Sequence, residues 1–263
     1  MAVALLTWTN EEKAYADVLI AILSDIHANR EAFEACLDTV SRDGAERLVL
    51  LGDIVGYGPD PEWCVERVRR LIEDGATVVR GNHDEAASKG AQAMTANARI
   101  AIEWTRTRLD AEARAFLGAL PMRADDEDRL YVHAEASAPE AWRYVLDPED
   151  ARRHLAACEA SVSFCGHTHR PALHCLSTMG RVTSFTPTAS EPIQLTRQRQ
   201  WLAVMGAVGQ PRDGNPAAAY GLYDTGTREL RFCRVAYDNE ATARKVIAAG
   251  LPEALATRLL RGH

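Results

Sequence analysis

Short apolar runs alternate with segments of helical periodicity in the first third of the chain. Residues 18–23 form an unbroken apolar run that ends in a polar turn, the pattern of a strand buried on both faces. Residues 30–41 then place apolar side chains three and four positions apart, and Gly44 comes next as a stop signal. We therefore expect a strand, a loop and a helix.

The same pattern recurs before residue 85. Residues 48–51 form a second apolar run, and residues 77–79 form a third. Between them, Asp60 is a candidate helix cap and Pro61 a first-turn residue of a helix that reaches about residue 73. Strands and helices that alternate in this way predict a parallel βαβαβ unit.

Helical spacing dominates the middle of the chain, and strand-like segments dominate its second half. Residues 91–109 and 110–120 have apolar positions at helical spacing. The later strand-like segments and helices are predicted at 130–133 (strand), from 147 (helix), 162–165 (strand), 172–236 (several strands, with turns at 179–180 and 213–214) and 239–260 (helical, broken near 250–252). The pattern thus indicates an α/β protein with a parallel first half and a β-rich second half.

Length and composition fit a single large domain. The chain has 263 residues, 47% of them hydrophobic, so it can bury a full core as one unit. We interpret residues 1–17 as an N-terminal extension and residues 18–263 as the domain. The six cysteines form no CxxC pair, which favours reduced thiols over a zinc ribbon.

Net charge and hydropathy restrict the kinds of binding partner that we expect. The net charge of −7 gives no sign of a surface that binds nucleic acid through phosphate neutralisation. No apolar run approaches the ~18 residues of a membrane span. No basic segment with an apolar run after it opens the sequence, so we expect no signal peptide. We expect a cytoplasmic protein with no membrane contact, and the sequence leaves its oligomeric state open.

Polar blocks come directly after the predicted strands, and they carry the candidate chemistry. Open α/β sheets place ligands outside the carboxyl ends of their strands, so blocks far apart in sequence can converge there. Imidazole, carboxylate and amide oxygen are ligands for divalent first-row metals, and there are enough of them for two ions. The first hypothesis is a two-metal hydrolase. The candidate metal ligands are Asp25, His27, Asp53, Asn82, His133, His167 and His169.

The spacing of these residues suits a shared centre. Asp53 is a candidate bridge between two ions, because the glycine before it lets the backbone approach a crowded site. Asp25 and His27 lie two apart after one strand, and His167 and His169 repeat this spacing after another. Each pair can point into one crevice.

Five polar blocks occur in this chain in the order Asp-x-His, Gly-Asp, Gly-Asn-His-Asp, a later His and Gly-His-x-His. In these blocks and their order the chain resembles the calcineurin-like metallophosphoesterase superfamily, over about residues 18–237. The resemblance implies a four-layer α/β/β/α sandwich of two mixed β-sheets flanked by helices. It also implies two divalent metal ions, with manganese as the first candidate and iron, zinc or nickel as alternatives. By that resemblance, the first metal is held by Asp25, His27, Asp53 and His169, and the second by Asp53, Asn82, His133 and His167.

The activity implied by this resemblance is metal-dependent hydrolysis of phosphoric esters. A metal-bridging hydroxide is expected to attack a phosphodiester or phosphomonoester in line. His83 resembles the residue that stabilises the developing charge and protonates the leaving oxygen, and Asp84 beside it is expected to fix the imidazole tautomer or favour its protonated form. The substrate is a small phosphoester or, as an alternative, a phosphoprotein cleaved by a protein phosphatase.

Other interpretations remain open. The chain could be a non-catalytic scaffold on the same fold, although the complete ligand set argues against that. Arg212 is a candidate phosphate ligand, but an Arg in such a turn more often pairs with a neighbouring Asp. Trp142 is interpreted as core or cap packing, and His154 and His174 as structural.

Two segments depart from the pattern of relatives. The small residues and proline that usually succeed the His133 position are replaced by Ala134-Glu135-Ala136, which is expected to add an acid near the second metal. An Asn-Pro-Gly-Ser segment is replaced by residues 204–207, Val-Met-Gly-Ala, which puts the local turn in question.

Overall fold

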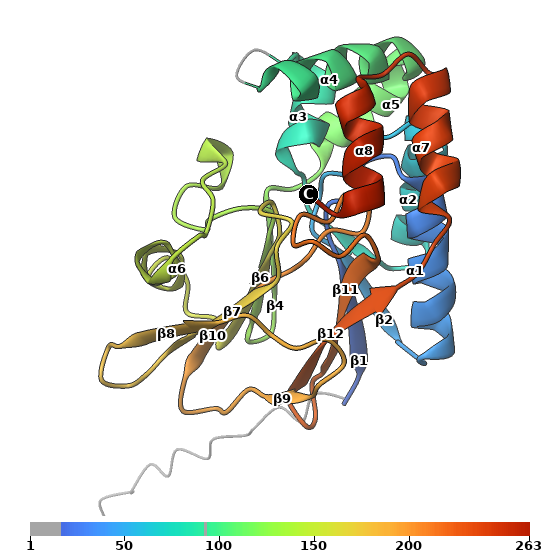
Figure 1. Cartoon of the computed structure of the whole chain (residues 1–263). Coiled ribbons are helices and arrows are strands. Elements are labelled where there is room, and N and C mark those ends of the chain that lie inside the picture. Colours follow the sequence, from blue (N-terminus) through green and yellow to red (C-terminus); the bar gives the residue numbers. More distant parts are fainter. Residues whose placement is uncertain (1–16, 92–93) are drawn as a thin grey trace, which may run out of the picture.

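The computed structural model describes residues 17–91 and 94–263. The extension predicted at residues 1–17 lies outside the described residues except for its last position, so it stays a prediction. Two six-stranded sheets face each other, and helices lie on the outer side of each sheet (Figure 1). This is the four-layer α/β/β/α arrangement that the family resemblance implied.

The first sheet contains the predicted βαβαβ unit. Its strand order is β3 (Thr77–Val78), β2 (Arg47–Leu50), β1 (Leu19–Leu23), β11 (Ala218–Asp224), β12 (Glu229–Val235) and β9 (Ile193–Gln194). Strands β1, β2 and β3 are parallel, whereas β11, β12 and β9 add antiparallel neighbours. Helices α1 (Arg30–Arg42) and α2 (Pro61–Glu73) are the two crossovers.

The second sheet is also mixed. Its order is β4 (Arg123–Asp126), β5 (Arg129–Val132), β6 (Val162–Cys165), β10 (Gln200–Val204), β7 (Ala172–Leu176) and β8 (Val182–Phe185). Strands β5, β6 and β10 are parallel to one another, and the other pairings are antiparallel. The β-rich second half therefore contributes to both sheets.

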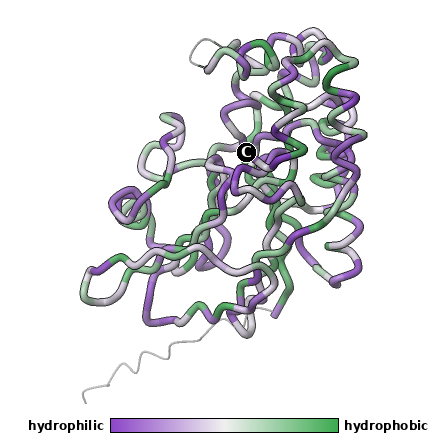
Figure 2. The backbone as a smooth tube through the Cα atoms, viewed as in Figure 1, coloured by the Kyte–Doolittle hydropathy of each residue, from purple (hydrophilic) through white to green (hydrophobic). Residues whose placement is uncertain are grey.

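The remaining helices lie around the two sheets and not between them (Figure 1). They are α3 (Asn82–Lys89), α4 (Ala96–Arg108), α5 (Ala111–Ala119), α6 (Pro148–Leu155), α7 (Asn239–Ala248) and α8 (Glu253–Arg261), with a short 3₁₀ turn at Pro139–Ala141. Helices α1, α2 and α7 lie on the side of the first sheet, and α6 lies outside the second (Figure 1). The helices alternate hydrophilic and hydrophobic residues along their length (Figure 2), as expected of helices with one face on a core.

Strand β1 shows why an unbroken apolar run was needed. Ile20 and Ile22 point into the core between the sheets, whereas Ala21 and Leu23 point toward the helices. Successive side chains of a strand face opposite sides, so both faces of β1 must be apolar. The prediction of a strand buried on both faces is confirmed.

Helix α3 and strand β4 were not predicted from the sequence. Helix α3 begins within the Gly-Asn-His-Asp block, and it is only 8 residues long with mostly polar or small residues, so it has no apolar stripe to reveal it. Strand β4 is the charged sequence Arg-Ala-Asp-Asp at a sheet edge, where only one neighbour pairs with it. Contacts with the rest of the fold, and not the local sequence pattern, determine that both elements form.

The six cysteines are all free thiols, as expected. Within residues 17–91 and 94–263, each helix is too short or too polar to cross a lipid bilayer.

Candidate metal centre

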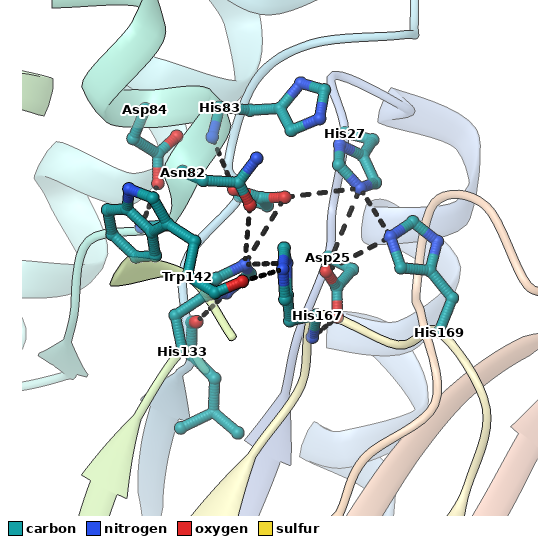
Figure 3. Close-up of polar contacts among 12 residues, drawn as sticks. Asp25, His27, Asn82, His83, Asp84, His133, Trp142, His167 and His169 are labelled. Atoms are coloured by element: carbon teal, nitrogen blue, oxygen red, sulfur yellow. Dashed lines mark hydrogen bonds and ion pairs between the residues drawn. The ribbon is translucent and has the colours of Figure 1, made fainter. Parts of the chain in front are cut away.

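The polar blocks converge at the carboxyl ends of four strands. Asp25 and His27 come after β1, Asp53 after β2, His133 after β5, and His167 and His169 after β6. Asn82 is the first residue of α3. Figure 3 shows these side chains turned toward one another from both sheets, with His27 and His169 on one side and His133 and His167 on the other.

The first group of ligand atoms surrounds the point between His27 and His169. The Nε2 atoms of these histidines lie 3.1 Å apart. Asp25 Oδ1 lies 3.3 Å from His169 Nε2 and 3.8 Å from His27 Nε2. All three side chains are at most 3% exposed.

Backbone carbonyls fix the tautomers of this first pair. His27 Nδ1 lies 3.2 Å from the carbonyl oxygen of Val55, and His169 Nδ1 lies 2.6 Å from that of Gln210. A carbonyl oxygen can only accept, so each Nδ1 must carry the proton. A neutral imidazole has only one such proton, so each Nε2 presents a bare lone pair to the other.

The second group surrounds His133 Nε2. This atom lies 3.1 Å from Asn82 Oδ1 and 3.2 Å from His167 Nδ1. His133 Nδ1 donates to the carbonyl of Leu51 at 2.7 Å, and His167 Nε2 donates to that of Trp142 at 2.9 Å. In the neutral form that binds a metal ion, the inward-facing nitrogens of both rings are acceptors, like the amide oxygen beside them.

Asp53 joins the two groups through one oxygen. Its Oδ2 lies 3.6 Å from His27 Nε2 and 3.5 Å from His133 Nε2. Its Oδ1 accepts the backbone N–H of His83 at 2.8 Å, and its Oδ2 is the oxygen that faces both groups. Asp53 thus has the place of a bridging ligand.

The arrangement fits two cations. Two groups of atoms that can act as acceptors converge, and buried acceptors that face one another are costly unless a cation or a proton lies between them. Among the described residues, Asp25, His27, Asp53 and His169 could hold one ion, and Asp53, His133 and His167 a second. Asn82 adds its amide oxygen to the second set. The structure thus brings the seven candidate ligands together in two groups, and their assignment to metal ions stays a prediction.

The charges of the metal-free centre are tightly coupled. Burial raises the pKa of Asp25 to about 6. Burial lowers the pKa of His133, but the Asp53 carboxylate outweighs it and raises that pKa to about 9. A proton on His133 therefore takes the place of a cation when none is bound.

Backbone strain marks the same residues. The candidate ligands with left-handed backbone conformations are Asp25 (φ 55°), His27 (φ 50°), Asp53 (φ 53°), His167 (φ 68°) and His169 (φ 59°). Such a conformation costs a residue with a side chain about 1–2 kcal/mol. Strain concentrated in the ligand loops is typical of functional sites, where the surrounding fold must hold it.

Gly52 allows the close approach that was expected before Asp53. Its φ is +89°, and a Cβ there would lie only 2.4 Å from the backbone nitrogen of Gly81. The loops that carry Asp53 and Asn82 can touch only because this side chain is missing.

His83 stands beside the centre rather than in it. Its ring lies 4.8 Å from that of His27 and 4.4 Å from that of Tyr57, and its Nδ1 has no hydrogen-bond partner among the described residues. Burial lowers the pKa of His83 to about 4, against the opposing effect of Asp53. The ring is therefore a neutral imidazole with one N–H at neutral pH.

The expected contact between Asp84 and His83 does not occur among the described residues. The carboxylate of Asp84 accepts backbone N–H groups instead, from Ile54 at 2.9 Å, Val55 at 3.3 Å and Gly81 at 3.0 Å. In this position it ties the loop after Asp53 to the start of α3. We correct its role accordingly: Asp84 positions the loops, and it does not set the tautomer of His83.

Arg212 lies at the edge of the centre without a carboxylate partner among the described residues. Its guanidinium stands 5.5 Å over the ring of Tyr57, its Nη2 donates to Gln210 Oε1 at 3.1 Å, and its buried Nε has no partner. The neighbouring Asp213 pairs with Arg234 instead. The alternative of a turn ion pair between Arg212 and Asp213 is therefore wrong.

The two departures from the pattern of relatives have structural roles. Glu135 is buried, and its carboxylate accepts the N–H and the hydroxyl of Ser137 at 2.7 and 2.6 Å, with Arg153 3.5 Å away. It therefore belongs to the loop network and is not one of the ligand groups. Met205 is buried in the core between the sheets, where Gly221 leaves room for its terminal methyl group.

A cavity of about 490 Å³ opens beside the centre. It is lined by Asn82, His83, His167 and Arg212, and also by Tyr57 and Trp142. The sequence interpretation of Trp142 as packing is incomplete, because this side chain also faces the cavity. Neither aromatic residue belongs to a ligand block, and only the fold brings them to the site.

Comparisons with known proteins agree with this geometry. A family model described as the calcineurin-like phosphoesterase superfamily domain matches residues 18–228. The uncharacterized protein MJ0912 of Methanocaldococcus jannaschii is 32% identical over 93% of this chain and 98% of its own length. The phosphodiesterase YfcE of Escherichia coli is 26% identical over 76% of this chain and 84% of its own length. A metallophosphoesterase from Sphaerobacter thermophilus superposes with a TM-score of 0.83 at 36% identity, over 94% of this chain and all of that structure.

Proposed function

The chain belongs to the calcineurin-like phosphoesterase superfamily, and on this premise we propose that it is a dimetal-dependent hydrolase of small phosphodiesters. The observation that carries the proposal is the position of Asp53 Oδ2, 3.6 Å from His27 Nε2 and 3.5 Å from His133 Nε2. One carboxylate oxygen shared by two groups of acceptors is the ligand that a pair of divalent ions requires.

Two divalent ions at this position would lower the pKa of a water and neutralise charge on the phosphoryl oxygens. Manganese is our first candidate, and the histidine, carboxylate and amide ligands are also compatible with iron, zinc or nickel. The side chains that would hold these ions are Asp25, His27, Asp53, Asn82, His133, His167 and His169.

The residues around the ligands supply the remaining functions. Arg212 has unused N–H groups beside the cavity, and we assign to it the binding of a non-bridging phosphate oxygen. His83 also faces the cavity, and its single N–H can donate to the oxygen of the leaving group as the bond to phosphorus breaks. Tyr57 packs against both His83 and His27 and fixes the position of these rings.

Two observations support a small diester, rather than a phosphoprotein, as the substrate. YfcE, which matches most of this chain, bears the name phosphodiesterase. The cavity has walls formed by α3 and α4 on one side and by the segment 139–144 on the other, which suits a small ligand more than a protein loop. A non-catalytic scaffold on this fold would not need His83, Arg212 and a complete ligand set together.

A substrate panel tests this proposal. The Mn²⁺-loaded protein is assayed with bis-p-nitrophenyl phosphate, p-nitrophenyl phosphate and a phosphopeptide. We expect the highest kcat/KM for the diester, and the loss of this activity in Asp53→Asn. Preferential turnover of the phosphopeptide would support a protein phosphatase instead, and no turnover of any substrate would support the scaffold.

A further inference from the structure

The cavity beside the centre has one wall of aromatic rings. The 3₁₀ turn Pro139–Ala141 and the residues after it bring Trp142 and Tyr144 to this wall. The ring of Tyr144 stacks on that of His167, with centroids 4.2 Å apart and planes at 10°. Tyr144 is 46% exposed although its ring is anchored in this way. An aromatic surface therefore begins at a metal ligand and leads away from it.

Trp142 is held at both ends. Its carbonyl oxygen accepts His167 Nε2–H at 2.9 Å, and its indole Nε1–H donates to Glu85 Oε2 at 3.0 Å. The backbone of Trp142 has the left-handed conformation, with φ 51°. A ring fixed by a ligand on one side and by α3 on the other loses little freedom when a substrate binds.

The opposite wall is apolar and made of small side chains. Ala86 from α3 and Ala98 from α4 line it, together with Ala91 and Met94. Because three of these four residues are alanines, space is left between this wall and the aromatic one. A flat group would contact both walls, and the rings of Trp142 and Tyr144 would bury one of its faces.

The charges near the cavity fit a ligand that is anionic at one end only. Arg212 and the metal ligands lie at the inner end. At the outer end, Lys89 is paired with Glu85 Oε1 at 2.5 Å, and the other oxygen of Glu85 accepts from Trp142. Lys89 thus has an acidic partner and the pair carries no net charge, so the outer part of the cavity suits an uncharged group better than a second phosphate.

We propose that the organic group on phosphorus in the substrate is an aromatic ring, either a nucleobase or an aryl group, which lies between Trp142 and Tyr144 and the alanine wall of α3 and α4. This inference rests on the proposed phosphoesterase function, since it assigns the part of the substrate that stays outside the metal centre. Stacking on fixed aromatic side chains accepts any flat ring and discriminates against saturated groups of similar size.

Binding of non-hydrolysable ligands tests the inference separately from catalysis. Phenylphosphonate, cyclohexylphosphonate and methylphosphonate share the anionic group and differ in the organic part. Isothermal titration calorimetry of the Mn²⁺-loaded protein should give a Kd for phenylphosphonate at least about tenfold below that of methylphosphonate, with cyclohexylphosphonate weaker than phenylphosphonate. Equal affinities for the phenyl and methyl compounds, or for the phenyl and cyclohexyl compounds, overturn the assignment.

A second ligand pair separates the two sources of an aromatic ring. Thymidine 5′-monophosphate and 2-deoxyribose 5-phosphate differ by the base alone, and their inhibition of bis-p-nitrophenyl phosphate hydrolysis is compared with the binding of the two phosphonates. The gain from the base is the inhibition constant of 2-deoxyribose 5-phosphate divided by that of thymidine 5′-monophosphate. The gain from the phenyl ring is the Kd of methylphosphonate divided by that of phenylphosphonate. A larger gain from the base identifies a nucleobase, and a smaller one identifies an aryl group. If bis-p-nitrophenyl phosphate is not hydrolysed, the proposed function fails, whereas the calorimetry still decides the binding of the ring.

Two variants locate the ring. In Trp142→Ala and, separately, in Ala98→Leu, which fills the opposite wall, we expect the phenyl-to-methyl affinity ratio to fall toward one. Ala96→Leu is the matched control, because Ala96 lies on the same helix, is exposed and does not line the cavity. An unchanged ratio in both Trp142→Ala and Ala98→Leu would place the ring elsewhere and overturn the proposal.

Discussion

His27 and His169 face each other with their Nε2 atoms 3.1 Å apart, and both Nδ1 protons are committed to backbone carbonyls. Two neutral imidazoles in this arrangement direct lone pair against lone pair, which is unfavourable unless a cation lies between them. The carbonyls of Val55 and Gln210 thus act as outer partners that orient the ligands and fix their tautomers. The backbone of both histidines is in the strained left-handed conformation, and the surrounding fold must stabilise it.

The role of His83 can be separated from that of the ligands. We expect His83→Ala to lower kcat at least about 100-fold, the usual effect of losing a hydrogen-bond donor to the charge that develops in the transition state, while the protein keeps its metal. Kinetics with bis-p-nitrophenyl phosphate, together with metal analysis of the same preparation, measures both effects. A variant that loses metal would show that His83 supports the ligands instead.

Gly56 provides the space for His83. Its φ is +90°, and a Cβ would lie 2.2 Å from His83 Nδ1, so Gly56→Ala should displace that ring and lower kcat. Gly75→Ala is the matched control, since Gly75 has φ +96° and nothing within 4 Å of its Cβ position. Both variants should lose about 1–2 kcal/mol of stability from the backbone conformation. Equal activity of the two variants would contradict the proposed position of His83.

Arg212 is expected to act on the substrate. Arg212→Ala should lower kcat/KM about 10- to 100-fold, because a charge-assisted hydrogen bond contributes about 1.5–3 kcal/mol. Arg234→Ala removes the partner of Asp213 in the same turn and serves as the control. If both variants lose activity equally, the effect belongs to the turn and not to phosphate binding.

His154 makes stability depend on pH outside the site. Burial lowers the pKa of His154 to about 3, whereas a histidine in the unfolded chain titrates near about 6.5. Between these values only the unfolded chain binds the proton, so stability present above pH 6.5 is lost as the pH falls.

The Asn variant tests this pH dependence. His154→Asn, which keeps an acceptor for the N–H of Ala136, should flatten the dependence of the free energy of unfolding on pH by up to about 1.4 kcal/mol per unit between pH 4 and 6. Urea titrations across this range give the slope, with His263→Asn at the exposed C-terminus as control. A slope identical to that of the wild type would show that His154 is not the group responsible.

The sequence predicts that the candidate ligands converge, because they come after strands with clear patterns. Val49 and Leu50 belong to a buried strand, so Asp53 had to lie at its carboxyl end, and the same holds for His167 after Phe164 and Cys165. Parallel neighbours then bring these ends together, as β5 and β6 do. Motif order and strand direction suffice for this part of the site.

The hydrogen bonds that support the site from outside the ligand groups are not predictable in the same way. Asp84 is adjacent to His83 in sequence, but helical geometry turns its carboxylate toward the amides of Ile54 and Gly81. Trp142 reaches His167 through its carbonyl group, which any residue type possesses. Contacts made by backbone groups leave no trace in the pattern of side chains.

The most direct test of the central claim is the number of Mn²⁺ ions bound per chain, measured by equilibrium dialysis and elemental analysis of the wild type, Asp25→Ala and Asp53→Ala. The shared oxygen of Asp53 predicts two ions in the wild type, one in Asp25→Ala and none bound tightly in Asp53→Ala. A single ion in the wild type, or two ions retained by Asp53→Ala, would contradict a dimetal centre bridged by Asp53.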